Sequence, residues 1–188
     1  MKIEHRRKIK KWKILRSAVA YKNPWWDIRE ETVLLPGGRR DQFYVNHSAG
    51  GVFVFPLTRD KRVILVRQYK HGARRIVLEL PIGRVEKSDK SLSRAEAREL
   101  LEETGFKPKK MRLLGSFAAF PTSSTTKFWI YLAEDCQQIS EPEDSDKEIS
   151  EVLSVSLPEL RRLLRSGKII SIIQAGAIYF VLDKMREL

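Results

Sequence analysis

The sequence predicts an α+β fold, in which a mixed β-sheet carries helices on its faces. Many short apolar runs have the length and β-branched composition of strands, and three other segments have the pattern of helices. The two kinds do not alternate regularly, as they would in a chain of βαβ units. The length of 188 residues and the hydrophobic content of 42% suit one globular domain with a real core and a small appendage.

The expected strands are apolar runs that end at turn residues. A turn at residues 36–40, P-G-G-R-R, and another at residues 58–61, T-R-D-K, separate the early runs, and Pro81 and Gly83 end a later one. The strands are expected at residues 43–45, 52–57, 63–69, 76–80, 113–120, 127–133 and 149–157, with an acidic loop at residues 134–146.

Two helices are expected after the last strand. The first has Ser156 as its N-cap, Pro158 in its first turn, Glu159 completing a capping box, and Gly167 as its terminator. The second starts after Ser171 and runs to about residue 185.

The charge is high and uneven, and the rest of the composition excludes several classes of protein. The net charge is +12, and residues 1–17 hold eight Lys or Arg and one acid, which indicates either a solvated tail or a surface for polyanions. A single cysteine excludes a disulfide framework. The N-terminus lacks the apolar core of a signal peptide, and the longest apolar stretch, residues 169–182, is too short to span a bilayer. We therefore expect a cytoplasmic protein with no membrane partner.

A third helix is expected at residues 94–104, earlier in the chain, and it gathers acidic residues. Ser93 and Glu96 form a capping box, and Gly105 is the expected residue after the C-terminus. With successive residues 100° apart, one side of this helix is mostly apolar and the other is acidic, with Arg98 at its edge. The apolar side holds Ala97, Leu100, Leu101 and Thr104, and the acidic side holds Glu99, Glu102 and Glu103.

Two interpretations fit this acidic side. It is a solvated helix face, or it holds a divalent cation. Like charges at i+3 and i+4 repel by a few tenths of a kcal/mol per pair, and a solvated face usually mixes signs. Mg²⁺ binds a few carboxylates, keeps several waters and uses its remaining positions for substrate phosphates. A magnesium ion would supply the counter-charge that the acidic side needs.

Gly83 and the stretch R-E-L-L-E-E-T-G-F at residues 98–106 resemble the Nudix box, G-x5-E-x7-R-E-U-x-E-E-x-G-U, where U is aliphatic or bulky. The second half of the box matches at every fixed position. In the first half the glutamate position falls on Asp89, and eight residues rather than seven separate it from Arg98, which we interpret as a one-residue insertion in the loop 87–92. Three further segments are similar to the ADP-ribose pyrophosphatase branch of the family, and the similarity runs from Tyr21 to the C-terminus. They read V-I-L-V-R-Q-Y-K-H, E-L-P-I-G-R-V-E and Y-K-N-P-W-W-D-I-R-E-E.

The resemblance implies an α/β/α sandwich and a pyrophosphatase. Residues 1–47 would form a basic tail and an N-terminal β-region that helps to build a homodimer, and residues 48–188 the Nudix domain. The implied reaction is Mg²⁺-dependent hydrolysis of a nucleoside diphosphate linked to a group X, with Mn²⁺ as the alternative ion. ADP-ribose, which would yield AMP and ribose 5-phosphate, is the first candidate. The stretch T-S-S-T-T-K after Pro121 departs from the branch pattern, so other nucleotide sugars and dinucleotides stay open.

The resemblance also assigns a metal site and a general base. Glu99, Glu102 and Glu103 and the carbonyl of Ile82 would hold the metal ion, with Glu102 also counted among the catalytic residues. Arg98 would orient a glutamate. Glu148 is expected to be the general base, and Asp146 and Glu151 are its rivals.

The expected substrate contacts come from three other parts of the chain. Arg67 and Lys70 would lie near the phosphates, with Lys70 acting as a point charge where the pattern usually has arginine. Trp25 and Trp26 would stack on a base, or at least one of them would pack in a core. Pro121 lies sixteen residues after Gly105, where the branch tends to have a proline.

Two other functions fit the same chain. The positive charge favours a Nudix hydrolase that acts on RNA 5′ ends or caps, for which strongly salt-dependent RNA binding would be the sign. The other is a Nudix-fold sensor that binds a nucleotide without cleaving it. The complete set of three glutamates argues against the sensor, because binding alone does not need all three.

Overall fold

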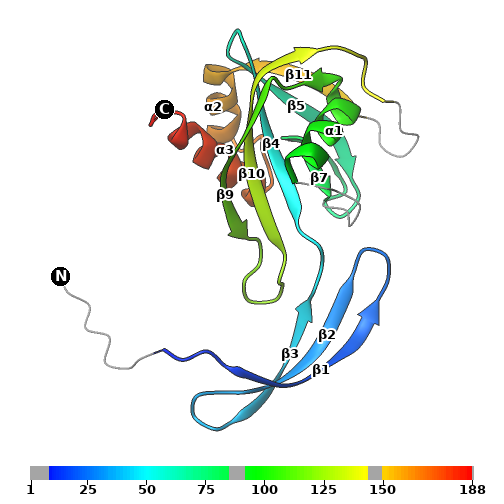
Figure 1. The fold of residues 1–188 in the computed structure, drawn as a ribbon, viewed down its shortest axis with the longest axis vertical. Helices are drawn as coiled ribbons and strands as arrows, with labels where there is room; N and C mark the ends of the chain where they lie inside the picture. The colour runs from blue at the N-terminus through cyan, green and yellow to red at the C-terminus, as the bar shows by residue number, and fades with distance from the viewer. Residues whose placement is uncertain (1–8, 85–91, 144–149, 188) are drawn as a thin grey trace, which may run out of the picture. The chain divides into compact units, whose positions relative to one another are not determined.

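The computed structural model describes residues 9–84, 92–143 and 150–187 (Figure 1). The chain divides into two compact units. The N-terminal unit consists of residues 1–48 and 118–126, and the larger unit consists of residues 49–117 and 127–188. The N-terminal unit is therefore made from two separate stretches of the chain.

The N-terminal unit is a three-stranded antiparallel sheet in the order β1-β2-β3. The strands are β1 (Lys13–Lys22), β2 (Asp27–Leu34) and β3 (Arg40–Asn46). Within this unit, residues 118–126 join the sheet through a parallel bridge between Asn46 and Ser124. The interpretation of residues 1–17 as a tail is wrong from Lys13 onward, because this part of the basic stretch is paired along β2.

The larger unit is built on an eight-stranded mixed sheet with the central order β11-β5-β4-β10-β8. Strand β4 pairs in parallel with β10 and antiparallel with β5, while β6, β7 and β9 pair with β5, β4 and β10 in turn. The strands are β4 (Gly51–Thr58), β5 (Arg62–Lys70), β6 (Arg75–Glu79), β7 (Ile82–Arg84), β8 (Phe106–Lys107), β9 (Lys110–Ala118), β10 (Lys127–Gln138) and β11 (Ser150–Ser156).

Three helices cover the two faces of this sheet: α1 (Leu92–Thr104), α2 (Leu157–Arg165) and α3 (Ile172–Lys184) (Figure 1). Side chains alternate between the faces of a strand. In β4, Phe53 and Phe55 accordingly join the large core cluster with residues of α2 and α3, whereas Val54 joins a smaller cluster with Leu100 of α1. The α/β/α sandwich is confirmed.

The cap of α2 is as predicted, and α3 begins after Ser171 as predicted. The Ser156 hydroxyl accepts a hydrogen bond from the Glu159 amide, and the Ser171 hydroxyl accepts one from the Gln174 amide. Among the described helices, none has the length and apolar character needed to cross a membrane.

Several predicted boundaries differ from the structure, among them those of α1 and β10. Helix α1 begins at Leu92, so Ser93 lies inside its first turn and is not the N-cap. Strand β10 continues to Gln138 through what was expected to be the start of an acidic loop, because residues 137–138 pair with β8.

Cys136 lies in the small core cluster under α1, and burial raises the pKa of its thiol to about 12 from its ordinary value of 9.0. The thiol should therefore resist iodoacetamide at pH 8 in the folded protein and react once guanidinium unfolds the chain, as intact-mass spectrometry would show. Because the folded state disfavours the thiolate, this group should also lower stability as the pH rises from about 9 to about 12. Rapid labelling of the native protein would contradict this assignment.

Candidate metal and pyrophosphate site

Helix α1 is held against the sheet by its apolar side and by a glycine at its end. Leu100 and Thr104 are fully buried, as predicted. Gly105 has a φ of +74°, and its amide donates to the Leu101 carbonyl at 2.7 Å, which ends the helix. A Cβ at this position would lie 2.1 Å from the Ser140 carbonyl oxygen, so only glycine fits. The C-terminal turn that carries Glu102 and Glu103 is thereby fixed.

Arg98 joins two of the three glutamates. Its Nη2 lies 2.7 Å from Glu99 Oε1 and its Nη1 lies 2.6 Å from Glu102 Oε2. The charges of the acidic side are therefore partly compensated, because the guanidinium of Arg98 forms ion pairs with two of its glutamates. This contact fixes the rotamers of Glu99 and Glu102, which fits the orienting role expected of Arg98.

Glu103 differs from the other two because it points into the protein. Burial, and next the charge of Glu99, raise the pKa of its carboxyl to about 7 from its ordinary value of 4.5. The charge of Lys70 and a hydrogen bond from the Ile82 amide lower this pKa, and the charge of Glu79 raises it. Its Oε2 atom is buried and has no hydrogen-bond partner among the described residues. A buried carboxylate oxygen of this kind is suited to a cation.

Strand β7 brings the backbone of Ile82 and Gly83 against α1. A Cβ at Gly83 would lie 2.7 Å from Glu99 Cγ and 3.2 Å from Glu96 Oε2. The two elements thus touch at a distance that only glycine allows. Ile82 contacts Glu103 through its backbone and directly precedes Gly83, which approaches Glu99. Its carbonyl was expected to act as a ligand.

Two carboxylates and a backbone carbonyl fit the way in which proteins hold Mg²⁺. In the part of the chain that the structure describes, no cluster of three or more acidic, histidine or cysteine side chains could hold a metal ion by itself. Mg²⁺ needs no such cage, because it keeps several waters and is usually bound by one or two carboxylates and by substrate phosphates. Glu99, Glu103 and the Ile82 carbonyl are candidates for these positions, and Arg98 contacts both Glu99 and Glu102.

A polar network that sequence reasoning missed lies next to Glu103. The Glu79 carboxylate accepts a hydrogen bond from Gln68 Nε2 at 2.6 Å and lies 3.3 Å from Lys70 Nζ. Glu79 and Gln68 are buried, and they belong to the paired strands β6 and β5. Glu96, which was predicted on this helix, is also fully buried. The alternation of β5 places Gln68 and Lys70 on one side of the strand, which was the available signal.

The remaining predicted residues of the larger unit have mixed outcomes. Arg67 is exposed and its Nη1 lies 2.9 Å from Glu151 Oε2, so Glu151 already has a cationic partner. Glu148 and Asp146, like Asp89 of the box, lie outside the described residues.

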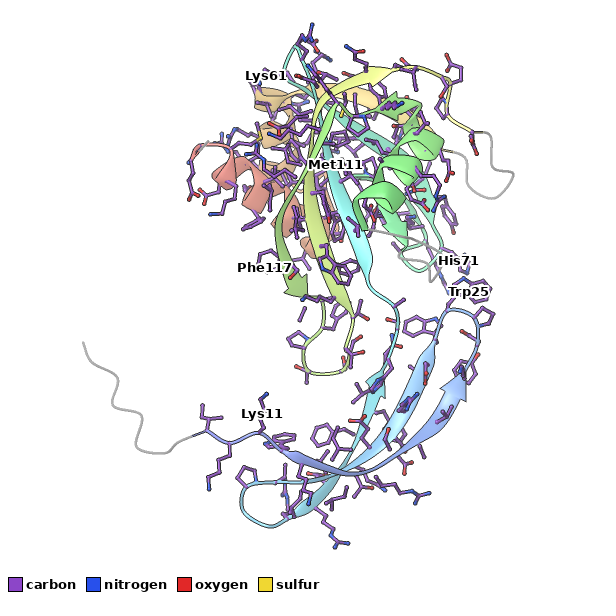
Figure 2. The ribbon with its side chains drawn as sticks, viewed as in Figure 1. Lys11, Trp25, Lys61, His71, Met111 and Phe117 are labelled. Atoms are coloured by element: carbon purple, nitrogen blue, oxygen red, sulfur yellow. The ribbon has the colours of Figure 1, made fainter. Side chains whose placement is uncertain are left out.

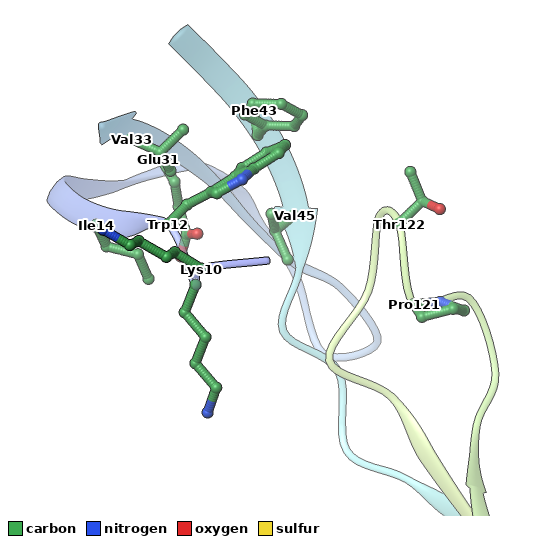
Figure 3. Close-up of a pocket in the computed structure, with 10 residues that line it drawn as sticks. Lys10, Trp12, Ile14, Glu31, Val33, Phe43, Val45, Pro121 and Thr122 are labelled. Atoms are coloured by element: carbon green, nitrogen blue, oxygen red, sulfur yellow. The ribbon is translucent and has the colours of Figure 1, made fainter. Parts of the chain in front are cut away.

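The predicted residues of the N-terminal unit lie on its surface. Trp25, labelled in Figure 2, is 64% exposed, and Trp26 is 50% exposed. The alternative that one of them packs in the core of this chain is therefore wrong. Both backbone amides donate to Asn23 Oδ1, which fixes the turn between β1 and β2. Pro121 lines a different feature, a hollow of about 450 Å³ walled by Trp12 and Phe43 (Figure 3).

Comparison with known proteins covers nearly the whole chain. The model of the family described as "NUDIX domain" matches residues 47–172, and that of the "Nucleoside diphosphate sugar hydrolase N-terminal domain" matches residues 12–46. The second match begins before Tyr21, so the similarity includes β1, which the sequence interpretation left out.

Two curated relatives and one solved structure are similar to the chain. An "ADP-ribose pyrophosphatase" of Bacillus subtilis (strain 168) is 30% identical over 82% of this chain and 84% of its own length. A "Methanol dehydrogenase activator" of Bacillus methanolicus is 26% identical over 76% of this chain and 77% of its own length. The crystal structure of an "ADP compounds hydrolase" superposes with a TM-score of 0.85 at 21% identity and covers 96% of this chain and 97% of its own. This last likeness concerns the fold.

Proposed function

Because the chain belongs to the Nudix family of pyrophosphohydrolases, we propose that it hydrolyses the pyrophosphate of a nucleoside diphosphate linked to another group. ADP-ribose is the first candidate, and AMP and ribose 5-phosphate are its products. The observation that carries the metal dependence is Glu103, whose buried carboxylate oxygen lies beside Glu99 and Ile82. The name of the Bacillus subtilis relative supports the choice of ADP-ribose. A cytoplasmic location stays a prediction.

The proposed metal ligands are Glu99, Glu103 and the Ile82 carbonyl, with Glu102 close to them. Bound Mg²⁺ would neutralise charge on the pyrophosphate oxygens and lower the pKa of a water molecule. Arg98 holds Glu99 and Glu102 in place, so that the carboxylates need not reorganise when substrate binds.

Other residues would hold the substrate and move the proton. Lys70 is directed to Glu79 and contributes positive potential at Glu103, which is where phosphate oxygens would approach. Arg67 is a second candidate for the phosphates, and Trp25, Trp26 and Pro121 for the nucleoside. Glu148 would accept a proton from the attacking water as the bond between phosphorus and the bridging oxygen breaks.

A homodimer belongs to the same proposal. Strand β1 is the outer strand of its sheet and exposes Ile14, Leu15 and Val19, which a second copy of the chain could cover. Light scattering after size exclusion should give twice the monomer mass of 21.9 kDa. A monomer at micromolar concentration would rule out a stable dimer.

A product assay tests the proposed reaction. The purified protein is incubated with Mg²⁺ and ADP-ribose, GDP-mannose, UDP-glucose, NADH or diadenosine polyphosphates, and chromatography identifies the nucleotide released. We expect AMP from ADP-ribose and no reaction after EDTA is added. Cleavage of another compound would reassign the group X, and no cleavage of any of them would refute the small-molecule proposal.

A second candidate is hydrolysis at RNA 5′ ends, and one observation favours it. Lys61, Lys109 and Lys110 line a hollow of about 400 Å³ at the end of β4, together with Glu134 and Asp135 of β10. Clustered lysines suit a phosphate backbone. Adding 5′-triphosphorylated RNA to the same assay distinguishes the two candidates, since processing of RNA without turnover of small nucleotides would favour this one.

A further inference from the structure

The side chain of Gln174 makes two hydrogen bonds with a single residue of another segment, Leu80. Its Oε1 accepts from the Leu80 amide at 3.0 Å, and its Nε2 donates to the Leu80 carbonyl at 3.3 Å. Gln174 is 3% exposed and Leu80 is fully buried. The pair joins the first turn of α3 to a segment 94 residues earlier in the sequence.

Leu80 needs this partner because it lies between two strands. Strand β6 ends at Glu79 and β7 begins at Ile82, so neither strand ladder includes Leu80. A buried backbone amide and carbonyl without partners would cost about 1–3 kcal/mol each. The carboxamide of Gln174 has the same donor and acceptor as a peptide group, and it takes the place of a neighbouring strand.

Leu80 is close along the chain to the proposed metal ligand at Ile82. Pro81 separates them. Its ring fixes φ, and it has no amide hydrogen to donate. The Pro81 carbonyl accepts a hydrogen bond from the Val54 amide at 3.1 Å. The Ile82 amide is hydrogen-bonded to Glu103. Gln174 holds the Leu80 backbone and Glu103 holds the Ile82 amide, so few backbone torsions between them remain free. The direction of the Ile82 carbonyl therefore depends on both contacts.

We infer that Gln174 is a positioning residue for the metal site, acting through Leu80 on the direction of the Ile82 carbonyl. The inference rests on the metal ligands assigned under the proposed function. It gives the C-terminal helix a part in the site, although none of its residues was assigned to metal or substrate. Gln174 and Ile82 also line one hollow of about 460 Å³, so the two lie in the same region of the unit.

The backbone of Gln174 is itself fixed by the helix cap. The Ser171 hydroxyl accepts from the Gln174 amide at 3.4 Å, and Ser171 is the N-cap of α3. Replacing Ser171 by Ala would loosen the first turn while keeping the carboxamide. We expect Ser171→Ala to weaken metal binding, as a change at Gln174 does, but by a smaller factor.

The test measures binding of Mn²⁺ directly, by electron paramagnetic resonance of the free ion, in the full-length protein without nucleotide. Gln174→Leu keeps the approximate volume and removes both hydrogen bonds, and Gln174→Glu keeps an acceptor for the Leu80 amide. We expect Gln174→Leu to raise the Kd for Mn²⁺ by about 10-fold to 100-fold, the range seen when partners of metal ligands are lost. Gln174→Glu and Ser171→Ala should give smaller increases.

The matched control is Ile178→Val on the same helix. Ile178 is fully buried and packs in the large core, so this change disturbs α3 without touching Leu80. Thermal unfolding of each variant shows how much stability was lost. If Gln174 were merely structural, both changes would alter Mn²⁺ binding in proportion to their loss of stability.

Kinetics separate the inference from the choice of substrate. On any nucleotide that the wild type cleaves, Gln174→Leu should need more Mn²⁺ for half-maximal rate and should regain kcat to within about 3-fold at saturating metal. Unchanged Mn²⁺ affinity in Gln174→Leu, or an equal loss in Ile178→Val, would overturn the inference, as would a wild type that binds no Mn²⁺. If Gln174→Leu does not fold, Gln174→Glu and Ser171→Ala decide by the same measurement. A wild type that binds Mn²⁺ but cleaves no nucleotide would refute the proposed reaction and leave this test intact.

Discussion

Glu103→Gln should reduce kcat/KM by at least about 100-fold. Mutation of residues that only support metal ligands already lowers metal affinity or activity by about 10-fold to 100-fold. Glutamine keeps the shape of the side chain and removes the negative charge at the buried oxygen. The measurement is the rate of AMP release at saturating Mg²⁺. Glu159→Gln, an exposed change on α2, is the matched control and should leave the rate unchanged. Full turnover in Glu103→Gln would mean that the metal ligands are wrongly assigned.

The same variant should be at least as stable as the wild type without divalent ions. The folded state raises the pKa of Glu103 from 4.5 to about 7, so its favourable contribution is present below about 4.5 and is lost as the pH rises through about 7. At pH 8 the charged carboxylate therefore opposes folding, and glutamine removes that cost. We expect a gain on the order of 1 kcal/mol, since one pKa unit corresponds to about 1.4 kcal/mol and the neighbours relax. Denaturant unfolding at pH 5 and pH 8 with EDTA checks this, and a loss of stability at pH 8 would contradict it.

Gly83→Ala should impair both activity and stability. Its Cβ would lie 2.7 Å from Glu99 Cγ and 3.1 Å from Glu99 Cβ, so α1 would have to move away from β7. Overpacking of this kind costs about 1–3 kcal/mol. A shift of the helix would also carry Glu99 and Glu103 away from the Ile82 carbonyl, and we expect kcat/KM to fall by about 10-fold or more. Thermal unfolding and the AMP-release assay measure the two effects.

Gly176→Ala is the matched control for Gly83→Ala. Gly176 lies inside α3, and a Cβ there would meet no heavy atom within 4 Å. Because glycine is a poor helix former, alanine should stabilise the protein by about 0.5–1 kcal/mol without changing activity. If both alanine variants behaved alike, the close contact between β7 and α1 would not be what positions the glutamates.

The sequence could predict what depends on local patterns. The central strands, the caps at Ser156 and Ser171, and the place of Gly105 follow from side-chain chemistry within a few residues. The family resemblance then supplied the sandwich and the candidate ligands. These predictions succeeded because turn residues, caps and the period of a helix act over short distances along the chain.

The parts that were missed depend on contacts between distant segments. Strand β1 shifts register between Ile14 and Arg16 and between Val19 and Tyr21, so its apolar residues do not alternate, and its many charges made it look like a tail. The burial of Glu96 follows from the close approach of β7 to α1. No periodicity could reveal the pairing of Gln174 with Leu80, which lies 94 residues away.

The division of the N-terminal unit into two stretches has a consequence for the order in which the protein is made. Its three strands leave the ribosome early, but residues 118–126 follow only after β9 has been synthesised. Until then Asn46 lacks Ser124, with which it forms a β-bridge. It also lacks the Ser123 carbonyl, which accepts a hydrogen bond from the Asn46 amide at 2.9 Å. A gene fragment that ends at residue 48 therefore encodes the three strands without the segment that pairs with Asn46.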